Sequence, residues 1–462
     1  MTRSATAPLT EQRFLLYGMG VTNTAVARAL GARGLVALLV DDGDAMRLRT
    51  IADELGTESV HAPDSARLAE LLDAVDAVIP APGLPEHHAV FAAAAAAGRP
   101  VLSEFDLAGA WDDRPVLAVT GTNGKTTVAT LVQSMLQHSG LESVAVGNLE
   151  TPLVAAIDDA GIDRFVVEAS SFRLAHSRSF RPSVATWLNF AEDHLDVHDS
   201  LEAYRAAKAR IFADQRSDDV AVLNGEDPVV AAAAPSGADG PTVLRFGLAA
   251  ETDGRPNDYH ETDGVLVGPD GVEIATSADL WSSLPHDRSN VLAAAATALA
   301  GGATIDGVRA ALAEFGGLAH RVQFVGEHAG VRWFDDSKAT APHATSAAVS
   351  GFSSVVLIAG GRNKGLDMST LAHGADAVTA VVGIGEAGAD VVAAFPDRPS
   401  HLATSMADAV AAAARLASPG DVVLLSPGCA SFDWYSSYAE RGDDFTQLVR
   451  TQVLGEPPAE AG

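Results

Sequence analysis

The strongest constraint on this chain is a glycine-rich segment at residues 120–127, which reads TGTNGKTT. The apolar run at 115–119 predicts a buried strand, and a helical pattern begins near Val128. A glycine-rich turn between strand and helix directs unpaired backbone N–H groups toward one point, where phosphate oxygens fit. Lys125 would reach the outer phosphates, and the Thr126 hydroxyl would bind Mg²⁺. We therefore predict a nucleoside triphosphate site. The alternative is a chance glycine-rich turn with an exposed lysine.

Composition narrows the class of protein. The chain has 462 residues, which suits three domains or two large ones. Its formal charge of −29 opposes non-specific binding to nucleic acid or to anionic membranes, and we attribute it to solubility. The single cysteine, Cys429, excludes an intramolecular disulfide and fits a reducing cytosol. No signal peptide is visible, and the alanine-rich stretches are too short to span a membrane. We expect a cytoplasmic monomer with small-molecule partners, no nucleic acid and no membrane.

Short apolar runs alternate with helical patterns in three blocks. This alternation favours an α/β fold of parallel sheets covered by helices. The blocks are expected at 1–104, 105–317 and 318–462. Strands are predicted at 13–17, 36–40, 77–79, 115–119, 165–167, 184–188, 220–223, 331–334, 355–359, 380–382 and 422–425. The segment 237–279, rich in Gly, Asp and Thr, predicts short strands and loops.

The first block opens like a dinucleotide-binding fold. Residues 18–23 read GMGVTN, a helix is predicted at 25–33, and the acidic pair Asp41 and Asp42 follows some twenty residues after the glycines. Asn23 stands where the third glycine of that pattern is expected. On these residues alone, a nicotinamide-dependent dehydrogenase and a purely structural tight turn are both open.

Three polar residues of the second block lie at positions where chemistry is plausible. Glu168 ends a buried strand, where a carboxylate needs a metal ion or hydrogen-bond donors such as helix N–H groups. His194 lies just beyond another strand and could be a metal ligand, an acid–base group or an exposed turn residue. Lys208 could be a solvated lysine on a helix, and spacing alone does not exclude this alternative.

The motifs together resemble the Mur ligase superfamily, cytoplasmic enzymes that add amino acids to peptidoglycan and folate precursors. The matching segments are TGTNGKTT at 120–127, GNL at 147–149, EASSF at 168–172, NFAEDHLD at 189–196, YRAAKARI at 204–211, DDSKAT at 335–340, GGRNKG at 360–365 and SPGCASFD at 426–433. They span nearly the whole chain, and those after Lys208 are similar to the glutamate-adding branch. The resemblance implies a Rossmann-like first domain for a UDP-linked substrate, a central P-loop domain for ATP and a Rossmann-like third domain for the incoming amino acid.

The resemblance also implies site residues. The implied ATP contacts are Gly121, Thr122, Asn123, Gly124, Lys125, Thr126, Thr127, Asn290, Arg321, Asp336 and Lys338. The implied contacts of the UDP-linked substrate are Gly20, Val21, Thr22, Asp41, Gly83, Asn148 and His194. The implied D-glutamate contacts are Thr340, Lys364, Ser431, Phe432 and Tyr438. The implied catalytic residues are Lys125, His194 and Lys208, and the implied ligands of two Mg²⁺ ions are Thr126, Glu168, His194 and Lys208, the last carbamylated by CO₂.

Some positions keep a plainer interpretation or depart from the family pattern. Asn148 could be a turn asparagine, and Arg321 could form an inter-domain salt bridge. Asn23, Gly43 and Asp287 differ from the family's usual residues near the uridine and adenine. Cys429 is expected to be a buried packing residue rather than a nucleophile, because no histidine base accompanies it in its motif.

The activity implied is ATP-dependent addition of D-glutamate to UDP-N-acetylmuramoyl-L-alanine through an acyl phosphate and a tetrahedral intermediate. Three rivals stay open: a sister ligase for another amino acid, a nicotinamide dehydrogenase, and a non-catalytic nucleotide-binding scaffold. Thr340, Lys364 and Ser431 argue against the first, and the phosphate loop is unexplained by the second. Lys125, Glu168, His194 and Lys208 argue for chemistry over the third.

Overall fold

The computed structural model describes residues 12–195, 197–363, 365–373 and 375–456. The chain divides into two compact units. One comprises the residues up to Ser283 together with Asp287–Phe315, and the other comprises Leu284–His286 and the residues from Gly316 onward. In the described part of the chain, no helix is long and apolar enough to cross a membrane.

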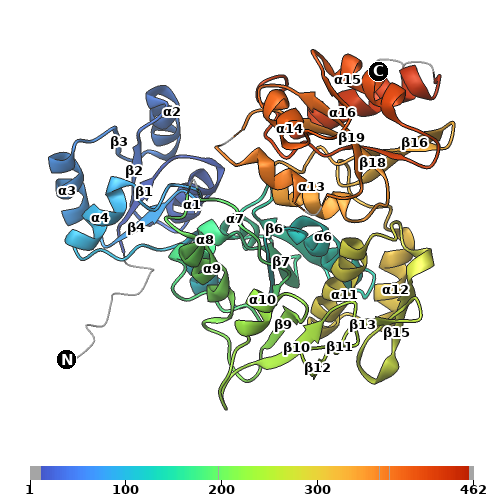
Figure 1. The fold of residues 1–462 in the computed structure, drawn as a ribbon. Helices are drawn as coiled ribbons and strands as arrows, with labels where there is room; N and C mark the ends of the chain where they lie inside the picture. The colour runs from blue at the N-terminus through green and yellow to red at the C-terminus, as the bar shows by residue number, and fades with distance from the viewer. Residues whose placement is uncertain (1–11, 196, 364, 374, 457–462) are drawn as a thin grey trace. The chain divides into compact units, whose positions relative to one another are not determined.

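The first unit begins with a four-stranded parallel sheet in the order β3-β2-β1-β4 (Figure 1). Its strands are β1 (Phe14–Tyr17), β2 (Ala37–Asp41), β3 (Ser59–His61) and β4 (Ala77–Pro80). Its helices are α1 (Val21–Ala32), α2 (Ala45–Leu55), α3 (Ser65–Asp73) and α4 (Ala89–Ala96). The predicted strands are confirmed, whereas β3 was not predicted because its three residues are only partly buried or exposed. Helix α1 starts earlier than predicted, immediately after Gly20.

A six-stranded parallel sheet follows in the order β10-β9-β8-β5-β7-β6. Its strands are β5 (Val116–Thr120), β6 (Ser143–Gly147), β7 (Arg164–Glu168), β8 (Val184–Trp187), β9 (Val220–Asn224) and β10 (Thr242–Phe246). The predicted strands of this block are confirmed, and β6 is additional. Because β5 lies between β8 and β7, the loops after these three strands meet at one edge of the sheet, where open α/β sheets bind ligands.

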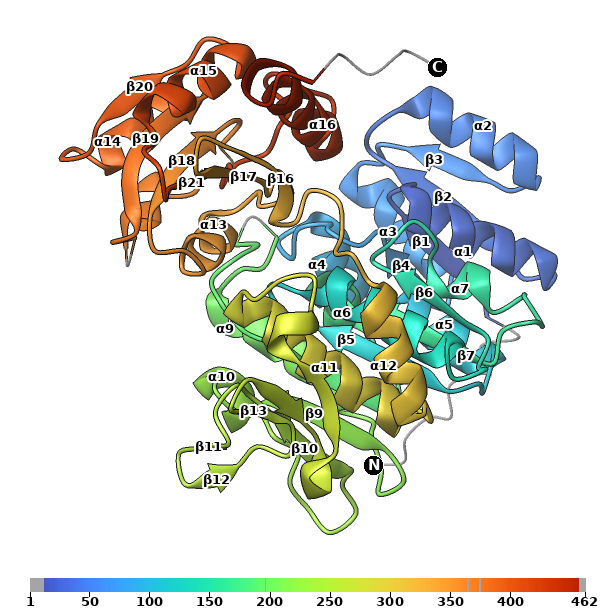
Figure 2. The same cartoon turned by 90° about the vertical axis from the view of Figure 1, so that its right-hand side faces the viewer.

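Helices cover both faces of this sheet. On one face, α6 (Lys125–Gln137), α11 (Pro285–Ala300) and α12 (Ile305–Glu314) form a core with β5, β7 and β8 (Figure 2). The other face carries α5 (Glu104–Trp111), α7 (Leu153–Ala156), α8 (Ser171–His176), α9 (Leu201–Ala209) and α10 (Pro228–Ala232). The core on this second face is continuous with residues of the first sheet. The small strands β11 (Glu251–Thr252), β12 (Arg255–Pro256), β13 (His260–Thr262), β14 (Val265–Val267) and β15 (Glu273–Thr276) confirm the prediction for 237–279.

The second unit holds a six-stranded sheet in the order β16-β17-β21-β18-β19-β20. Its strands are β16 (Gln323–His328), β17 (Val331–Asp335), β18 (Val355–Gly360), β19 (Val378–Ile384), β20 (Ser400–Leu402) and β21 (Val422–Leu425), all parallel except β16. Helices α15 (Met406–Leu416) and α16 (Tyr438–Leu448) cover one face, and α13 (Pro342–Val349) and α14 (Gly388–Ala394) the other (Figure 1). The four strands predicted here are confirmed; β16 and β20 were missed.

Candidate active site

The phosphate loop connects β5 directly to α6. The helix begins at Lys125, three residues earlier than predicted, so Lys125, Thr126 and Thr127 form its first turn. Gly124 precedes the helix with φ of +83°. Because glycine has no side chain, it cannot cap the backbone N–H groups of the first turn. A Cβ on Gly124 would lie 2.5 Å from Oδ1 of Asn290. The loop therefore requires glycine for its backbone and for the close approach of α11.

Asn290 lies nearer the middle of its helix than expected. It is the sixth residue of α11 rather than the first, because that helix begins at Pro285. Asn290 and Asp287 are both buried, and Asn290 is close enough to Gly124 to contact the loop. The structure thus places the predicted adenine-side asparagine beside the phosphate loop.

Two lysines converge on this loop. Nζ of Lys125 donates to the carbonyl oxygens of Gly121 at 2.9 Å and Thr122 at 3.0 Å. Nζ of Lys208, on α9, donates to the same Gly121 carbonyl at 2.7 Å. Lys208 is 1% exposed, which excludes the alternative of a solvated lysine. Burial and the Lys125 charge hold the pKa of Lys208 well below its usual value, so its neutral amine is favoured.

Glu168 joins three elements at the sheet edge. Its Oε2 accepts a hydrogen bond from the Thr126 hydroxyl at 2.8 Å, and its Oε1 accepts one from the Asn148 side-chain amide at 3.0 Å. The Asn148 backbone N–H also donates to the Glu168 carbonyl at 2.8 Å. Glu168 is 3% exposed, and these donors are side chains rather than the helix N–H groups of the alternative interpretation. Carboxylate and hydroxyl oxygens next to a phosphate loop are ligands that suit Mg²⁺.

His194 lies in an aromatic cluster beside the loop. Its backbone has φ of +57°, and its ring contacts Phe172 and Tyr204, with centroids 4.7 and 6.0 Å apart. Nε2 of His194 lies 3.3 Å from Oδ2 of Asp193. The buried Tyr204 contacts Thr122 through its hydroxyl at 3.2 Å, and Nζ of Lys208 lies 4.7 Å from its ring centroid. Tyr204, which the sequence did not single out, thus links His194, Lys208 and the loop.

The described residues contain no group of three or more His, Cys, Asp or Glu side chains placed to hold a metal ion. The local oxygen donors are Glu168 and Thr126. A carbamate on Lys208 would add an anionic oxygen ligand, and a neutral amine is the form that reacts with CO₂. The residues therefore fit Mg²⁺ if Lys208 is carbamylated and phosphate oxygens complete the coordination.

In the first block, the contacts of Asn23 account for an asparagine at the position where the glycine pattern expects a third glycine. It is fully buried, and its Nδ2 contacts the carbonyl oxygens of Tyr17, Gly18 and Ile79 at 2.9–3.1 Å. The side chain therefore ties together the ends of β1 and β4 behind the start of α1. Gly20 precedes that helix without a side-chain cap, so the N–H groups of Gly20, Val21 and Thr22 remain suited to phosphate.

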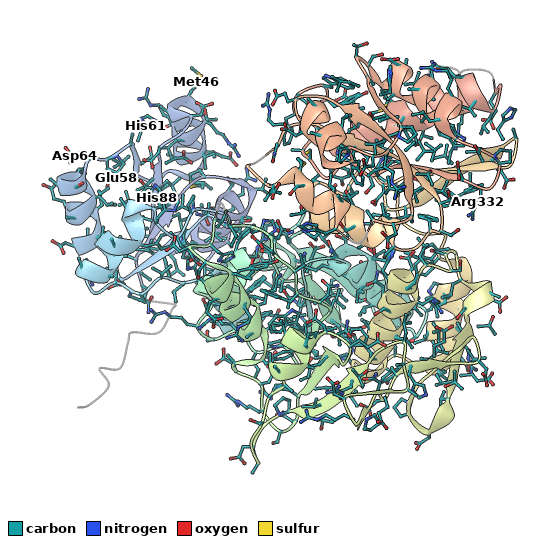
Figure 3. All side chains as sticks on the ribbon, viewed as in Figure 1. Met46, Glu58, His61, Asp64, His88 and Arg332 are labelled. Carbon is teal, nitrogen blue, oxygen red and sulfur yellow. The ribbon has the colours of Figure 1, made fainter. Side chains whose placement is uncertain are left out.

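The turn after β2 is held by its own acidic pair. Asp41 accepts hydrogen bonds from the backbone N–H groups of Met19 and Gly43. Asp42 accepts from the Tyr17 hydroxyl at 2.8 Å and contacts Nε2 of His88 at 3.2 Å. Burial and Asp42 raise the pKa of Tyr17. His88 and His61 are both labelled in Figure 3, and Nε2 of His61 lies 2.8 Å from the Gly43 carbonyl oxygen of the same turn. Asp41 thus shapes the turn that is predicted to meet the nucleoside, and Gly83, with φ of +83°, lies in the turn after β4.

Arg173 contacts two predicted site residues, and the sequence analysis did not single it out. Its guanidinium donates to Oγ1 of Thr22 at 2.9 Å, to Oδ1 of Asn148 at 3.1 Å and to Oε1 of Glu104 at 3.1 Å. The side chain is 6% exposed, and it joins two predicted contacts of the UDP-linked substrate. An arginine directly after EASSF was the only available signal, because its partners are distant in sequence.

In the second unit, the DDSKAT segment begins at Asp335, the last residue of β17. Asp336 accepts from the Ser426 hydroxyl at 2.7 Å, and burial raises its pKa to about 7. The Arg321 charge acts on the pKa of Asp336 in the opposite direction, which places these two predicted ATP contacts near each other. Nζ of Lys338 lies 5.0 Å from the ring centroid of Tyr438.

The SPGCASFD segment follows β21 in the same sheet. Ser431 is buried, Thr340 is partly buried and Phe432 is 59% exposed. Lys364 lies outside the described residues. Cys429 is buried beside Met368, and burial raises its pKa to about 12, which agrees with a packing role.

Arg441 was also missed by the sequence analysis. This buried side chain on α16 donates to Oγ of Ser337 at 2.9 Å, to the Ser337 carbonyl at 2.8 Å and to the Cys429 carbonyl at 3.1 Å. It therefore holds the two motif segments of the second unit together.

Comparison with known proteins identifies the family. Residues 119–298 match the Mur ligase middle domain, and residues 320–429 match the Mur ligase glutamate ligase domain. A UDP-N-acetylmuramoylalanine–D-glutamate ligase of Desulfosudis oleivorans is 41% identical over 463 residues, covering 96% of this chain and 97% of that protein. One of Frankia casuarinae is 41% identical over 458 residues, covering 95% and 94%. This chain belongs to the Mur ligase family.

Solved structures agree on the fold. MurF from Acinetobacter baumannii superposes with a TM-score of 0.58 at 18% identity, covering 95% of this chain and 91% of that one. UDP-N-acetylmuramate–alanine ligase MurC from Thermotoga maritima gives 0.56 at 18% identity, covering 96% and 100%. The α/β sheets described above are therefore those of a Mur ligase, as the motifs indicated.

Proposed function

We propose that this protein joins D-glutamate to UDP-N-acetylmuramoyl-L-alanine at the expense of ATP, as a cytoplasmic, monomeric ligase. The observation that carries the proposal is the convergence of Lys125, Lys208 and Glu168 at one sheet edge. Asn148 donates a hydrogen bond to the same glutamate. The relatives named as D-glutamate ligases, which align over nearly the full chain, support the choice of amino acid.

The first chemical step would activate a carboxylate. A carboxylate oxygen of the L-alanyl group attacks the γ-phosphorus of ATP, an O–P bond forms, and the bond to the bridging oxygen breaks to release ADP. The Lys125 ammonium and the amides at the start of α6 would stabilise the charge on the transferring phosphoryl group. Phosphorylation is needed because a free carboxylate is a poor electrophile.

The second step would form the amide. The neutral amine of D-glutamate attacks the acyl carbon, and a tetrahedral intermediate forms. The C–O bond to phosphate then breaks, and the nitrogen loses a proton. We assign binding of D-glutamate to the second unit, through Thr340, Lys364, Ser431, Phe432 and Tyr438.

Bound Mg²⁺, with two ions expected, would supply positive charge to the phosphate oxygens. We assign Thr126, Glu168, His194 and a carbamylated Lys208 as its ligands. Carbamylation joins the Lys208 nitrogen to the carbon of CO₂ and releases one proton. The low pKa of Lys208 supports this, since the reaction requires the free amine.

An isotope experiment tests the mechanism. UDP-N-acetylmuramoyl-L-alanine carrying ¹⁸O in its carboxylate is incubated with ATP, Mg²⁺, bicarbonate and D-glutamate, and the products are analysed by mass spectrometry. The proposal predicts one ¹⁸O atom in the released phosphate and one ¹⁸O atom retained in the new amide carbonyl of the glutamyl product. Unlabelled phosphate alongside the same product would exclude the acyl phosphate.

A further inference from the structure

A buried histidine outside the predicted site connects the first block to the central sheet. His198 follows β8 in the loop before α9, and its side chain is 1% exposed. Its Nδ1 lies 2.8 Å from Oε1 of Glu86, and its Nε2 lies 2.9 Å from Oγ of Ser171. An ionised carboxylate can only accept, so Nδ1 donates to Glu86, and in the neutral ring Nε2 accepts from the Ser171 hydroxyl.

Glu86 also forms hydrogen bonds with the backbone on both sides of His198. Its Oε2 accepts from the Asp199 N–H at 3.1 Å, and its own N–H donates to the Val197 carbonyl at 2.9 Å. Glu86 belongs to the loop after β4, three residues beyond Gly83, a predicted contact of the UDP-linked substrate. The loop is therefore attached to segment 197–199 by a side chain and by the backbone.

His198 also supports the surroundings of His194. Its ring stacks on Phe172, with centroids 5.6 Å apart, and lies against Tyr204 at 5.2 Å. These are the same two rings that His194 contacts. The backbone N–H of His198 donates to the His194 carbonyl at 3.0 Å, which closes the turn where His194 has its positive φ.

We propose that His198, held between Glu86 and Ser171, is a positioning residue that fixes the His194 turn relative to the loop after β4. This connection holds the loop after β4 at a fixed position relative to the phosphate-loop edge of the central sheet. The inference rests on the proposed function for its kinetic consequence, but the connection itself is testable without substrate. It assigns no chemistry to His198.

The kinetic test compares His198→Phe, which keeps a ring against Phe172 and Tyr204 but loses both hydrogen bonds, with Glu86→Gln, which keeps an acceptor for Nδ1. The control is His138→Phe, at the far end of α6 from the phosphate loop. We expect kcat/KM for UDP-N-acetylmuramoyl-L-alanine to fall about 10- to 100-fold in His198→Phe, as for residues that orient metal ligands. KM for ATP should be unchanged and the control should stay near wild type, whereas Glu86→Gln, which keeps the acceptor for Nδ1 but loses the one for the Asp199 N–H, should fall between wild type and His198→Phe.

A purely structural role would lower Tm in His198→Phe while every KM and the kcat per folded molecule stayed at the wild-type value, and that result overturns the proposal. An equal rise in KM for ATP does the same. Hydrogen exchange of the free protein supplies the second readout. Glu86→Ala should accelerate exchange at both 170–174 and 197–204, whereas acceleration confined to the loop around position 86 contradicts the connection. If the wild-type protein forms no glutamyl product, the proposed function fails, and the exchange result alone decides the connection.

Discussion

At the scale of single residues, burial changes the pKa values of charged side chains in the candidate site. Lys208 shows this most clearly, because the helix pattern left open a solvated lysine, whereas the side chain is buried against the phosphate loop. Two ammonium groups on the same Gly121 carbonyl oxygen would repel each other, and loss of the proton from Lys208 would remove the repulsion. The loop therefore has two lysines on one carbonyl oxygen, and burial together with the Lys125 charge lowers the pKa of Lys208.

Replacing Lys208 with arginine tests this arrangement. Arginine stays charged and cannot form the carbamate, so we expect kcat to fall by about 100-fold or more, at the upper end of the effect of lost ligand support. Arg205→Lys on the same helix, at a residue paired with Glu202 at the surface, is the control and should keep wild-type activity. A ¹³C carbamate signal after labelling with ¹³C-bicarbonate should be present in the control and absent in Lys208→Arg. Equal activity in both variants would remove Lys208 from the mechanism.

His176 gives a stability prediction with a defined pH window. The residue ends α8 and stacks on Phe91, and burial lowers its pKa to about 4 from 6.5. Between pH 4 and 6.5 the unfolded chain therefore binds a proton at this site that the folded chain does not, so the free energy of unfolding rises with pH across this window. Urea denaturation of His176→Gln should show a smaller rise from about pH 4.5 to about pH 7 than wild type. Identical pH dependence would place the effect elsewhere.

At the scale of elements, the predicted strands account for the meeting of the candidate site residues at one sheet edge. The apolar runs before Gly121, Glu168 and His194 all became strands of one parallel sheet, so their following residues meet at one edge. The start of α6 was placed three residues late because Lys125, Thr126 and Thr127 carry no apolar periodicity. Arg173, Arg441 and the Glu86–His198 pair could not be predicted, since their partners lie far away in sequence and spacing gives no information on such contacts.

Two glycines with nearly equal φ angles allow the cost of backbone strain to be measured separately from the cost of a steric contact. Gly124 lies in the phosphate loop, and Gly140 lies after α6. Gly124 has φ of +83° and Gly140 has φ of +79°, but only Gly124 has neighbours within 4 Å of a Cβ position. Gly140→Ala should cost about 1 kcal/mol of stability from the left-handed backbone alone and leave ATP binding unchanged. Gly124→Ala should cost more and weaken ATP binding by tenfold or more, roughly 1.4 kcal/mol, as measured by calorimetry with a non-hydrolysable ATP analogue. Equal effects on both stability and binding would mean that the contact with Asn290 is unimportant.

At the scale of the whole molecule, the predicted ATP contacts belong to two compact units. Lys125 and Thr126 lie in the first, and Asp336 and Lys338 lie in the second. Domain closure around the nucleotide is therefore expected to assemble the site and exclude water. The finer division into blocks at 1–104, 105–317 and 318–462 stays a prediction.

Small-angle scattering tests closure. The radius of gyration should decrease when a non-hydrolysable ATP analogue, Mg²⁺ and UDP-N-acetylmuramoyl-L-alanine are added together, and less with the nucleotide alone. The same data should give the molecular mass of a monomer. Superimposable profiles with and without ligands would contradict closure.

The central claim is tested most directly by phosphate release from ATP with UDP-N-acetylmuramoyl-L-alanine, Mg²⁺ and bicarbonate, comparing D-glutamate with L-glutamate, L-lysine, diaminopimelate and glycine. The account predicts release with D-glutamate only, together with a product heavier by one glutamyl residue. Release with a different amino acid would keep the family and contradict the assigned substrate. Absence of release with all five, despite measurable ATP binding, would contradict the proposed ligase activity itself.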